Sequence, residues 1–168
     1  MKVTDKEKGL TAERLRELLD YSPETGEFRW RVRRGSARSG SVAGGQNLGY
    51  RTIRVDHTLY MAHRIAWLHA YSEWPEHEID HVNGIKHDNR TVNLRKATRA
   101  ENTENQRKVK KDTVSGLLGV SLDDRRNKFQ ARIKLNGKSS SLGYFDTAEE
   151  AHQAYLVAKR ELHPFCTI

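Results

Sequence analysis

The chain has 168 residues, of which 36% are hydrophobic, and a formal net charge of +8 at pH 7. This length and apolar content favour small modules over one large core. The only cysteine, Cys166, excludes an internal disulfide framework and a zinc ribbon built from cysteines. The first residues lack an apolar signal segment, and no apolar run approaches the roughly 20 residues of a membrane span. We therefore expect a soluble protein of a reducing compartment, with no membrane contact and no structural zinc.

The positive charge is concentrated in two parts of the chain. Residues 29–54 contain seven arginines and no acidic residue, and residues 106–138 contain ten lysines and arginines against three aspartates. Each part has a net charge of +7, so the rest of the chain has −6. Two basic zones in an otherwise acidic chain favour a polyanionic partner that is bound at two places, because each neutralised phosphate releases counterions. A basic surface without such a partner is the alternative.

The N-terminal part, residues 1–62, predicts a helix followed by arginine-rich strands. Thr11 is a suitable N-cap for a helix over residues 11–20, where leucines recur at helical spacing. After it, residues 28–33 alternate apolar residues with arginines, so one face of the strand is core and the other is basic. Four outward arginines of this part are predicted to bind DNA: Arg29, Arg31, Arg33 and Arg54.

The next segments predict a loop, a hairpin and a helix. Residues 34–50 are rich in glycine and serine and lack periodicity, which predicts a mobile loop. Residues 53–61 predict a hairpin with its turn at Asp56 and His57, and the hairpin leads into a helix over residues 62–71. Pro75 then breaks the chain.

Residues 78–102 combine turn-forming and chemically reactive side chains in one short stretch. The sequence EIDHVNGIKHDNRTVNLRKATRAEN predicts a strand, a long turn that begins at Asn83-Gly84, a second strand and a helix. Thr98 and Glu101 form a capping box at the start of this helix, which we expect to run to residue 108.

Four side chains of this stretch suit phosphodiester hydrolysis, which needs a base, positive charge and stabilisation of the leaving oxygen. A neutral His81 can act as the general base, and Asn93 is the candidate to orient its ring. If the unit folds back on itself, Asn102 in the first turn of the helix lies beside Asp80. The carboxylate and the amide oxygen are hard ligands that suit one divalent ion, Mg²⁺ or Mn²⁺, which keeps several waters.

The stretch HRIAWLHAYSEWPEHEIDHVNGIKHDNRTVNLRKATRAEN resembles the HNH homing-endonuclease family common in phages. The shared motifs are the HR-x-x-W helix, the WP turn, I-D-H-x-N-G, D-N-R, N-L-R and the final E-N. The resemblance implies a ββα-metal nuclease core with His81 as general base, Asn93 as its orienting residue, and Asp80 and Asn102 as metal ligands. Ser72 departs from the family, which usually has glycine at this helix end.

Other polar residues of the stretch have simpler interpretations. Three are interpreted as hydrogen-bonding residues that shape the turn: Asp88, Asn89 and Arg90. Asn105 could replace Asn102 as a ligand, although the spacing favours Asn102. His63 either packs against the core or contacts phosphate.

The C-terminal residues, 116–168, predict a separate unit that follows a basic linker at residues 109–115. In the strand KFQARIKL, residues 128–135, apolar residues alternate with basic or amide-bearing ones, so one face is buried and the other suits a DNA major groove. Asn136-Gly137 predicts a turn to a partner strand, and Thr147 with Glu150 predicts a capped helix. The buried stripe of that helix is expected at Ala151, Ala154, Tyr155, Ala158 and Leu162.

This unit resembles the APETALA2-type DNA-binding domain through its G-V start, K-F-x-A-x-I strand, L-G-x-F turn and A-x-x-A-x-x-A-Y helix. The resemblance implies a three-stranded sheet backed by one helix. Ser139 and Ser141 stand where plant relatives have arginine and tryptophan, so the plant type of target site is not implied. The residues predicted to contact DNA are Arg126, Lys128, Gln130, Arg132 and Lys134.

Together, these patterns predict an α+β fold with an HNH core at residues 63–108, and a site-specific, metal-dependent DNA endonuclease of the homing type. One active site per chain predicts that a monomer nicks double-stranded DNA and that two copies are needed to cut both strands. The resemblance implies the cytoplasm of a host bacterial cell. The alternatives are a DNA-binding regulator with an inactive nuclease scaffold, and a nuclease that acts on RNA or without sequence preference.

Overall fold

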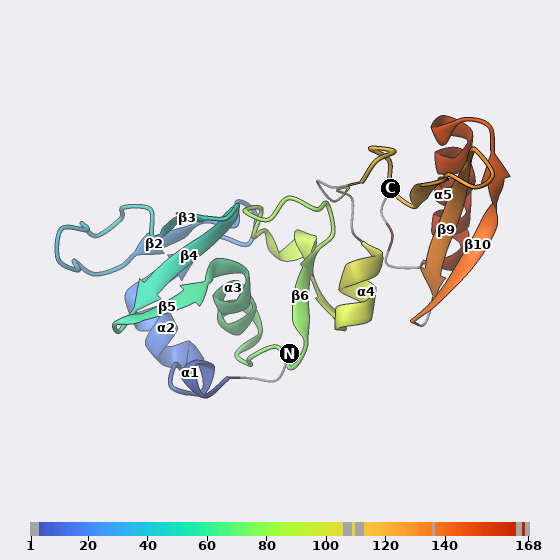
Figure 1. Ribbon diagram of the computed structural model, residues 1–168. Coiled ribbons are helices and arrows are strands. Elements are labelled where there is room, and N and C mark those ends of the chain that lie inside the picture. Colours follow the sequence, from blue (N-terminus) through green and yellow to red (C-terminus); the bar gives the residue numbers. More distant parts are fainter. Residues whose placement is uncertain (1–3, 106–108, 110–112, 136, 164–165, 167–168) are drawn as a thin grey trace. The chain divides into compact units, whose positions relative to one another are not determined.

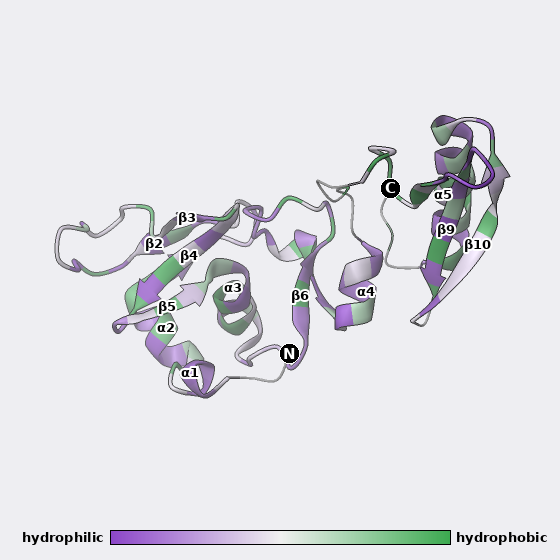
Figure 2. Cartoon of the chain, viewed as in Figure 1, coloured by the Kyte–Doolittle hydropathy of each residue, from purple (hydrophilic) through white to green (hydrophobic). Residues whose placement is uncertain are grey.

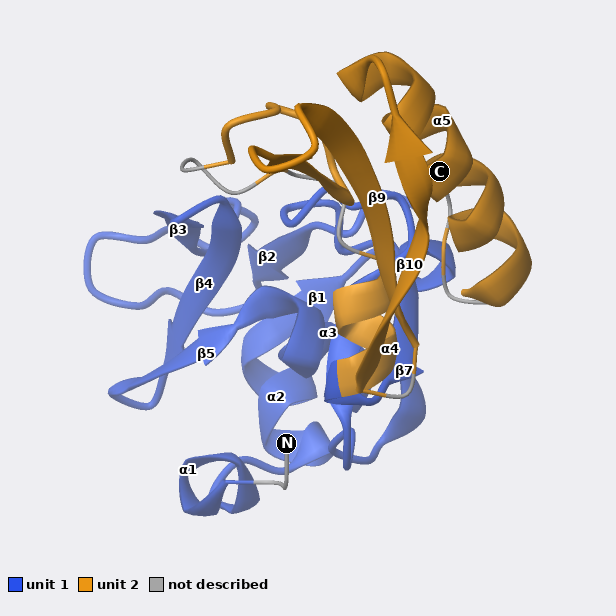
Figure 3. Ribbon diagram, turned by 45° about the vertical axis from the view of Figure 1, so that its right-hand side comes forward, with its two compact units in different colours: residues 1–99 blue, residues 100–168 orange. Residues whose placement is uncertain are grey.

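The computed structural model describes residues 4–105, 109, 113–135, 137–163 and 166. The chain divides into two compact units, residues 1–99 and residues 100–168 (Figure 1, Figure 3). Both units combine helices with small antiparallel sheets. In the part of the chain that the structure describes, no helix is long and apolar enough to cross a membrane.

Two short helices open the first unit, and a threonine caps each of them. Thr4 caps α1 (Asp5–Lys8), and the Thr11 hydroxyl accepts a hydrogen bond of 3.1 Å from the Arg14 N–H at the start of α2 (Ala12–Leu18). The predicted Thr11 cap is therefore confirmed. The sequence did not predict α1, and α2 ends two residues early because the chain turns into a strand at Leu19.

The first hairpin joins β1 (Leu19–Tyr21) to β2 (Phe28–Trp30), with Tyr21 opposite Phe28. Phe28 and Trp30 are buried and Arg29 is exposed, as the alternation predicts. The prediction fails at Val32, which is 41% exposed because β2 has already ended at Trp30.

Residues 34–50 are more regular than the mobile loop that their composition predicts. The Ala43 N–H donates to the Phe28 carbonyl at 2.7 Å, and Ala43 is fully buried. The segment ends in β3 (Gly45–Asn47), which pairs with β4 (Tyr50–Val55). The prediction of a loop is thus wrong for β3 and for the start of β4, and backbone hydrogen bonds to β2 tie down part of the remaining irregular segment.

A second hairpin leads into the central helix of the first unit. β4 pairs with β5 (Thr58–Met61) through the predicted turn at Asp56 and His57, both of which have positive φ. The helix α3 (Ala62–Tyr71) follows and has the predicted bounds. Its C-cap, Ser72, adopts a left-handed conformation with φ 60°, and Arg16 donates to its hydroxyl at 2.7 Å. This hydrogen bond helps to hold a conformation that glycine usually supplies.

One hydrophobic core runs through the first unit and draws on its whole length, from Leu10 to Leu94. A buried ion pair lies beside this core, between Arg64 of α3 and Glu7 of α1. Arg64 also donates hydrogen bonds of 3.0 Å to the carbonyls of Pro75 and His77. One guanidinium therefore fixes both α1 and the segment that leads into the next strand.

That segment leads into β6 (Glu78–His81), which pairs with β7 (Leu94–Ala97) after the short 3-10 helix η1 (Thr91–Asn93). The helix α4 (Arg99–Glu104) follows at the boundary between the units, with all but its first residue in the second unit. The rest of the predicted helix, residues 106–108, lies outside the described residues.

The second unit is a three-stranded sheet that packs against one helix. β9 (Lys128–Leu135) lies between β8 (Val120–Asp123) and β10 (Lys138–Phe145). The predicted alternation along β9 is confirmed at Ala131 and Ile133, which are buried. Hydrophilic and hydrophobic residues alternate as purple and green bands along β9 (Figure 2). The helix α5 (Ala148–Leu162) begins with the predicted capping box.

Two parts of the prediction for this unit need comment. Ala151 and Ala158 are buried as expected, but Leu162 is 40% exposed because it lies in the last turn of α5. The predicted Asn136 and the middle of the linker, residues 110–112, lie outside the described residues.

Candidate active site

The candidate site is built on the β6–β7 pair, which brings the two ends of a long loop together. Asp80 lies opposite Arg95 and His81 opposite Leu94. One residue further, the Val82 N–H donates to the Asn93 carbonyl at 2.9 Å. The residues 82–93, which we name the active-site loop, therefore leave and re-enter the sheet at adjacent positions.

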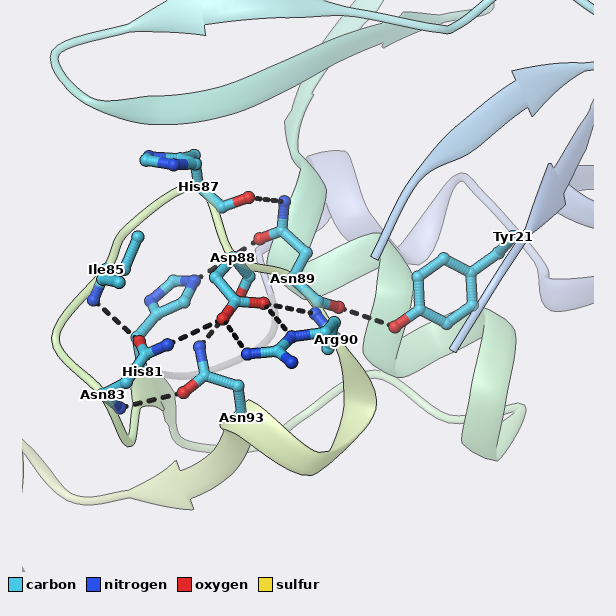
Figure 4. A network of polar contacts seen from close by, with 9 residues as sticks. All are labelled: Tyr21, His81, Asn83, Ile85, His87, Asp88, Asn89, Arg90 and Asn93. Carbon is cyan, nitrogen blue, oxygen red and sulfur yellow. Dashed lines mark hydrogen bonds and ion pairs between the residues drawn. The ribbon is translucent and has the colours of Figure 1, made fainter. Parts of the chain in front are cut away.

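Asp88 organises the interior of the active-site loop (Figure 4). Its carboxylate accepts hydrogen bonds of 2.7 Å from the Asn83 side chain, and of 2.8 and 2.6 Å from the Arg90 guanidinium. The hydrogen bond from Arg90 lowers the pKa of Asp88 to about 2, so this carboxylate is ionised at neutral pH. Asp88 and Arg90 therefore shape the turn, as their sequence context predicts.

Asn93 fastens the two ends of the active-site loop. Its side-chain oxygen accepts a hydrogen bond of 2.9 Å from the Asn83 N–H, and its side-chain nitrogen donates to the Asp88 carbonyl at 2.7 Å. Both polar atoms of the Asn93 amide are therefore bound to the loop backbone, beside the strand that carries His81. Through these hydrogen bonds Asn93 fixes the shape of the loop next to His81.

The side chain that contacts His81 is Asn89, which the sequence interpretation assigned to the turn. The Asn89 side-chain oxygen lies 3.4 Å from His81 Nε2, and Asn89 is 1% exposed. The Asn89 nitrogen donates to the His87 carbonyl at 3.2 Å, which fixes the orientation of the amide with its oxygen toward His81. An amide oxygen only accepts, so this contact is a hydrogen bond in the tautomer that carries the hydrogen on Nε2 and the lone pair on Nδ1.

His81 is buried in a group of rings that favours its neutral form. Its ring centroid lies 5.1 Å from that of His63 and 6.1 Å from that of Tyr50. Burial lowers the pKa of His81 below its ordinary value of 6.5, although the hydrogen bond to Asn89 and the charge of Asp80 partly oppose this. His81 is therefore neutral at pH 7, as a general base must be.

His63 packs beside His81 and is itself buried. Burial, with smaller contributions from His81 and Arg64, lowers the pKa of His63 to about 3. Its Nδ1 atom is buried, and no hydrogen-bond partner for it occurs in the described parts of the chain. His63 thus belongs to the wall of the site rather than to the exposed surface.

Asp80 is held in a single orientation by its cross-strand neighbour. Arg95 donates to the same carboxylate oxygen of Asp80 from two nitrogens, at 2.9 and 2.7 Å. Asp80 is 6% exposed and ion-paired, which compensates the cost of burying its charge. Asn102, the other predicted ligand, lies on α4 in the second unit.

The donor set was tested for a metal ion. Among the residues that the structure describes, no group of three or more His, Cys, Asp or Glu side chains is arranged to hold a metal. The oriented, buried carboxylate of Asp80 suits a hard ion that takes one or two protein oxygens and keeps its waters, as Mg²⁺ does.

The arginines of the first unit that were predicted to bind DNA also make internal contacts. Arg29 forms an ion pair of 3.0 Å with Glu27, and Arg31 lies 3.6 Å from Asp20. Arg33 donates to the Gly35 carbonyl at 3.5 Å, and Arg54 to the His57 carbonyl at 3.0 Å. All four remain exposed, so their charges face solvent while acidic groups partly offset two of them.

Four of the five predicted DNA-contacting residues of the second unit lie on β9, and Arg126 lies in the turn that precedes it. Arg132 and Lys134 are exposed on the face of β9 opposite to the buried Ala131 and Ile133. Gln130 donates to Ser141 at 3.0 Å and to Tyr144 at 2.9 Å across the strand pair. The two remaining basic residues form ion pairs, Arg126 with Asp123 at 2.8 Å and Lys128 with Asp146 at 3.0 Å.

Comparison with known proteins agrees with the geometry of the first unit. Residues 60–104 match the model of the HNH endonuclease family, so this part of the chain is an HNH endonuclease domain. The match runs from β5 into α4 and contains Asp80 and His81 of β6, the active-site loop with Asn93, and Asn102 of α4. Such nucleases act on DNA and generally depend on a divalent metal. Comparisons with curated proteins and with solved structures found no match.

Proposed function

We propose that the chain is a site-specific DNA endonuclease of the homing type that hydrolyses a phosphodiester in a metal-dependent reaction. The observation that carries the proposal is the state of His81. This residue is buried, neutral and bonded through Nε2 to Asn89, and it adjoins the oriented carboxylate of Asp80 inside an HNH endonuclease domain.

His81 is assigned as the general base. With its hydrogen on Nε2, the ring takes the proton of the attacking water at Nδ1 and becomes an imidazolium. The Asn89 oxygen then accepts a stronger, charge-assisted hydrogen bond from Nε2, and the negative charge of Asp80 favours the same state. Asn93 keeps its predicted orienting role in a different form, because it fixes the loop that carries Asn89.

Asp80 would hold the divalent ion, Mg²⁺ or Mn²⁺, and the resemblance to HNH homing endonucleases implies Asn102 as its second ligand. When bound, such an ion supplies positive charge to the phosphate and to the leaving 3′ oxygen. Arg95 keeps one oxygen of Asp80 in a fixed direction and so orients the carboxylate. The products would be 5′-phosphate and 3′-hydroxyl ends.

The second unit is proposed to bind double-stranded DNA in the manner of an APETALA2-type domain. Its support is the exposed basic face of β9, with Arg132 and Lys134 on the side of the sheet that α5 does not cover. The Gln130, Ser141 and Tyr144 network adds hydrogen-bonding groups suited to base edges or phosphates. We propose that this face selects the target and that the exposed arginines of the first unit add affinity.

The test is the relaxation of supercoiled plasmid that contains candidate phage sequence, in Mg²⁺ and in Mg²⁺ with EDTA. Wild-type protein and His57→Asn should cleave only with free metal, and His81→Asn should not cleave. His57 is the matched control because it lies in an exposed turn whose positive φ asparagine accepts. An initial nicked product without linear DNA would support nicking by a monomer.

Two results would contradict this proposal. If all three proteins shift DNA in a gel but none cleaves it, the chain is a DNA-binding regulator with an inactive nuclease scaffold. If RNA or unrelated DNA is cleaved as fast as the candidate sequence, the site-specific part of the proposal fails.

A further inference from the structure

The turn between β1 and β2 lies directly against the active-site loop, although it is outside the residues that match the HNH family. The Tyr21 hydroxyl donates to the Asn89 carbonyl at 2.6 Å (Figure 4). It also lies 3.1 Å from the Thr91 hydroxyl. The Thr91 N–H donates to the Pro23 carbonyl at 3.1 Å. Two hydrogen bonds of opposite direction therefore join the turn to residues 89–91.

The approach of the two backbones is closer than any side chain would allow. A Cβ atom added at Gly26 would lie 2.6 Å from the Arg90 nitrogen and 2.6 Å from the Asn89 carbonyl carbon. Gly26 also has φ 72°, a conformation that other residues rarely adopt. The glycine thus allows the turn to touch the loop backbone at the residue that contacts His81.

The turn is rigid enough to act as a support. The Gly26 N–H donates to the Ser22 carbonyl at 2.8 Å, and the Ser22 N–H to the Glu27 carbonyl at 3.0 Å. The Tyr21 ring packs against Phe28, with a centroid distance of 4.7 Å, and against His69 at 5.6 Å. The ring position therefore does not depend on the hydroxyl, which can be removed without disturbing the packing.

Asn89 connects this support to the candidate base. Its backbone carbonyl accepts from Tyr21, and its side-chain oxygen faces His81 Nε2. We propose that Tyr21 and the turn of residues 22–27 are a positioning element, which holds Asn89 so that the His81 ring keeps its hydrogen on Nε2 and presents Nδ1 to the attacking water. This inference rests on the proposed nuclease function.

The experiment compares Tyr21→Phe with Tyr60→Phe. Tyr60 is the matched control because its hydroxyl also donates to a backbone carbonyl, that of Lys6 at 3.0 Å, in the same unit but not at the active-site loop. For Tyr21→Phe we expect kcat for plasmid nicking to fall about 10- to 100-fold with little change in KM, as for other small misplacements of a catalytic group. Tyr60→Phe should keep the wild-type kcat.

A second measurement determines which nitrogen of the His81 ring carries the hydrogen, and it does not depend on cleavage. In long-range ¹H–¹⁵N correlation spectra of the metal-free protein at pH 7.5, wild type and Tyr60→Phe should show His81 with its hydrogen on Nε2. Tyr21→Phe should show a mixture with the Nδ1–H form, because the Asn89 backbone loses the hydrogen bond from Tyr21 and Asn89 is held less firmly by its contacts to His87 and Gly26. A purely structural role for Tyr21 would lower the melting temperature without changing this pattern.

The outcomes separate the two proposals. If wild type cleaves and Tyr21→Phe cleaves equally well with an unchanged His81 spectrum, the positioning inference is overturned and the nuclease function stands. If Tyr21→Phe loses DNA affinity but keeps kcat, the inference is also overturned. A wild type that never cleaves DNA overturns the proposed function first, and the positioning role in catalysis with it.

Discussion

Acidification should destabilise the first unit through His63. In the folded protein the pKa of His63 is lowered to about 3, against 6.5 for the exposed side chain. Between these values the unfolded chain binds a proton at His63 that the folded chain does not, so the free energy of unfolding falls as the pH falls. From pH 7 to pH 5 this single group should remove about 2 kcal/mol.

Urea unfolding at pH 7 and pH 5, followed by tryptophan fluorescence, measures this quantity. All three tryptophans, Trp30, Trp67 and Trp74, lie in the first unit, so the signal reports that unit. His63→Phe keeps an aromatic ring against Tyr50 and His81 but does not titrate. Its loss of stability between the two pH values should be about 2 kcal/mol smaller than that of the wild type.

The comparison removes the contributions of other groups. His69 and His81 also have lowered pKa values and destabilise the folded state in the same pH range, but they are present in both proteins. If wild type and His63→Phe lose equal stability on acidification, His63 is not buried in its neutral form, and the description of the ring group around His81 is wrong.

Three further predictions follow from contacts described above. Gly26→Ala should lower the free energy of unfolding by about 2 kcal/mol or more in thermal unfolding, and should slow cleavage, because the new Cβ clashes with backbone. Gly35→Ala is the control: it has φ 57° but no atom within 4 Å of the new Cβ, so it should show only the cost of its positive φ. Glu7→Gln should lower the free energy of unfolding in urea by about 3 kcal/mol, because it leaves Arg64 buried without its partner charge. Glu17→Gln removes an exposed ion pair with Arg14 and should leave the free energy of unfolding almost unchanged. Replacing both Arg132 and Lys134 by alanine should reduce the slope of log K for DNA binding against log salt concentration by about 0.9 per lost phosphate contact. Arg160→Ala on α5 is the control and should keep the wild-type slope. If the double variant also keeps the wild-type slope, this face of β9 does not bind DNA.

Local features of the fold could be predicted from the sequence because local contacts decide them. Thr11 and Thr147 cap helices through hydrogen bonds that span three residues, and the alternation along β9 follows from the pleat of a strand. The segment 34–50 could not be predicted in this way. Its order comes from backbone hydrogen bonds to strands elsewhere in the chain, for which glycine and serine carry no side-chain signal.

The candidate site was predicted in its residue types but not in its contacts. Asp80 and His81 were found from the D-H pair and the family resemblance, and both lie in the β6–β7 frame. The contact of Asn89 with His81 was missed because asparagine next to Asp88 is typical of a turn. The D-N-R motif was the only sequence signal for this contact, and the motif does not show which of its three side chains points toward His81. The Tyr21 contact joins residues 68 positions apart, which no local pattern reveals.

The continuous core of the first unit limits how the nuclease can be inherited or engineered. The family match begins at residue 60, yet the cluster that supports it includes Leu15, Phe28 and Ile53 from before that point. A fragment cut at the match would expose the apolar face of α3 and lose the anchor of Arg64. Recombination between genes, or grafting onto a new DNA-binding protein, would therefore have to move the N-terminal helices and hairpins together with the nuclease loop as one transferable part.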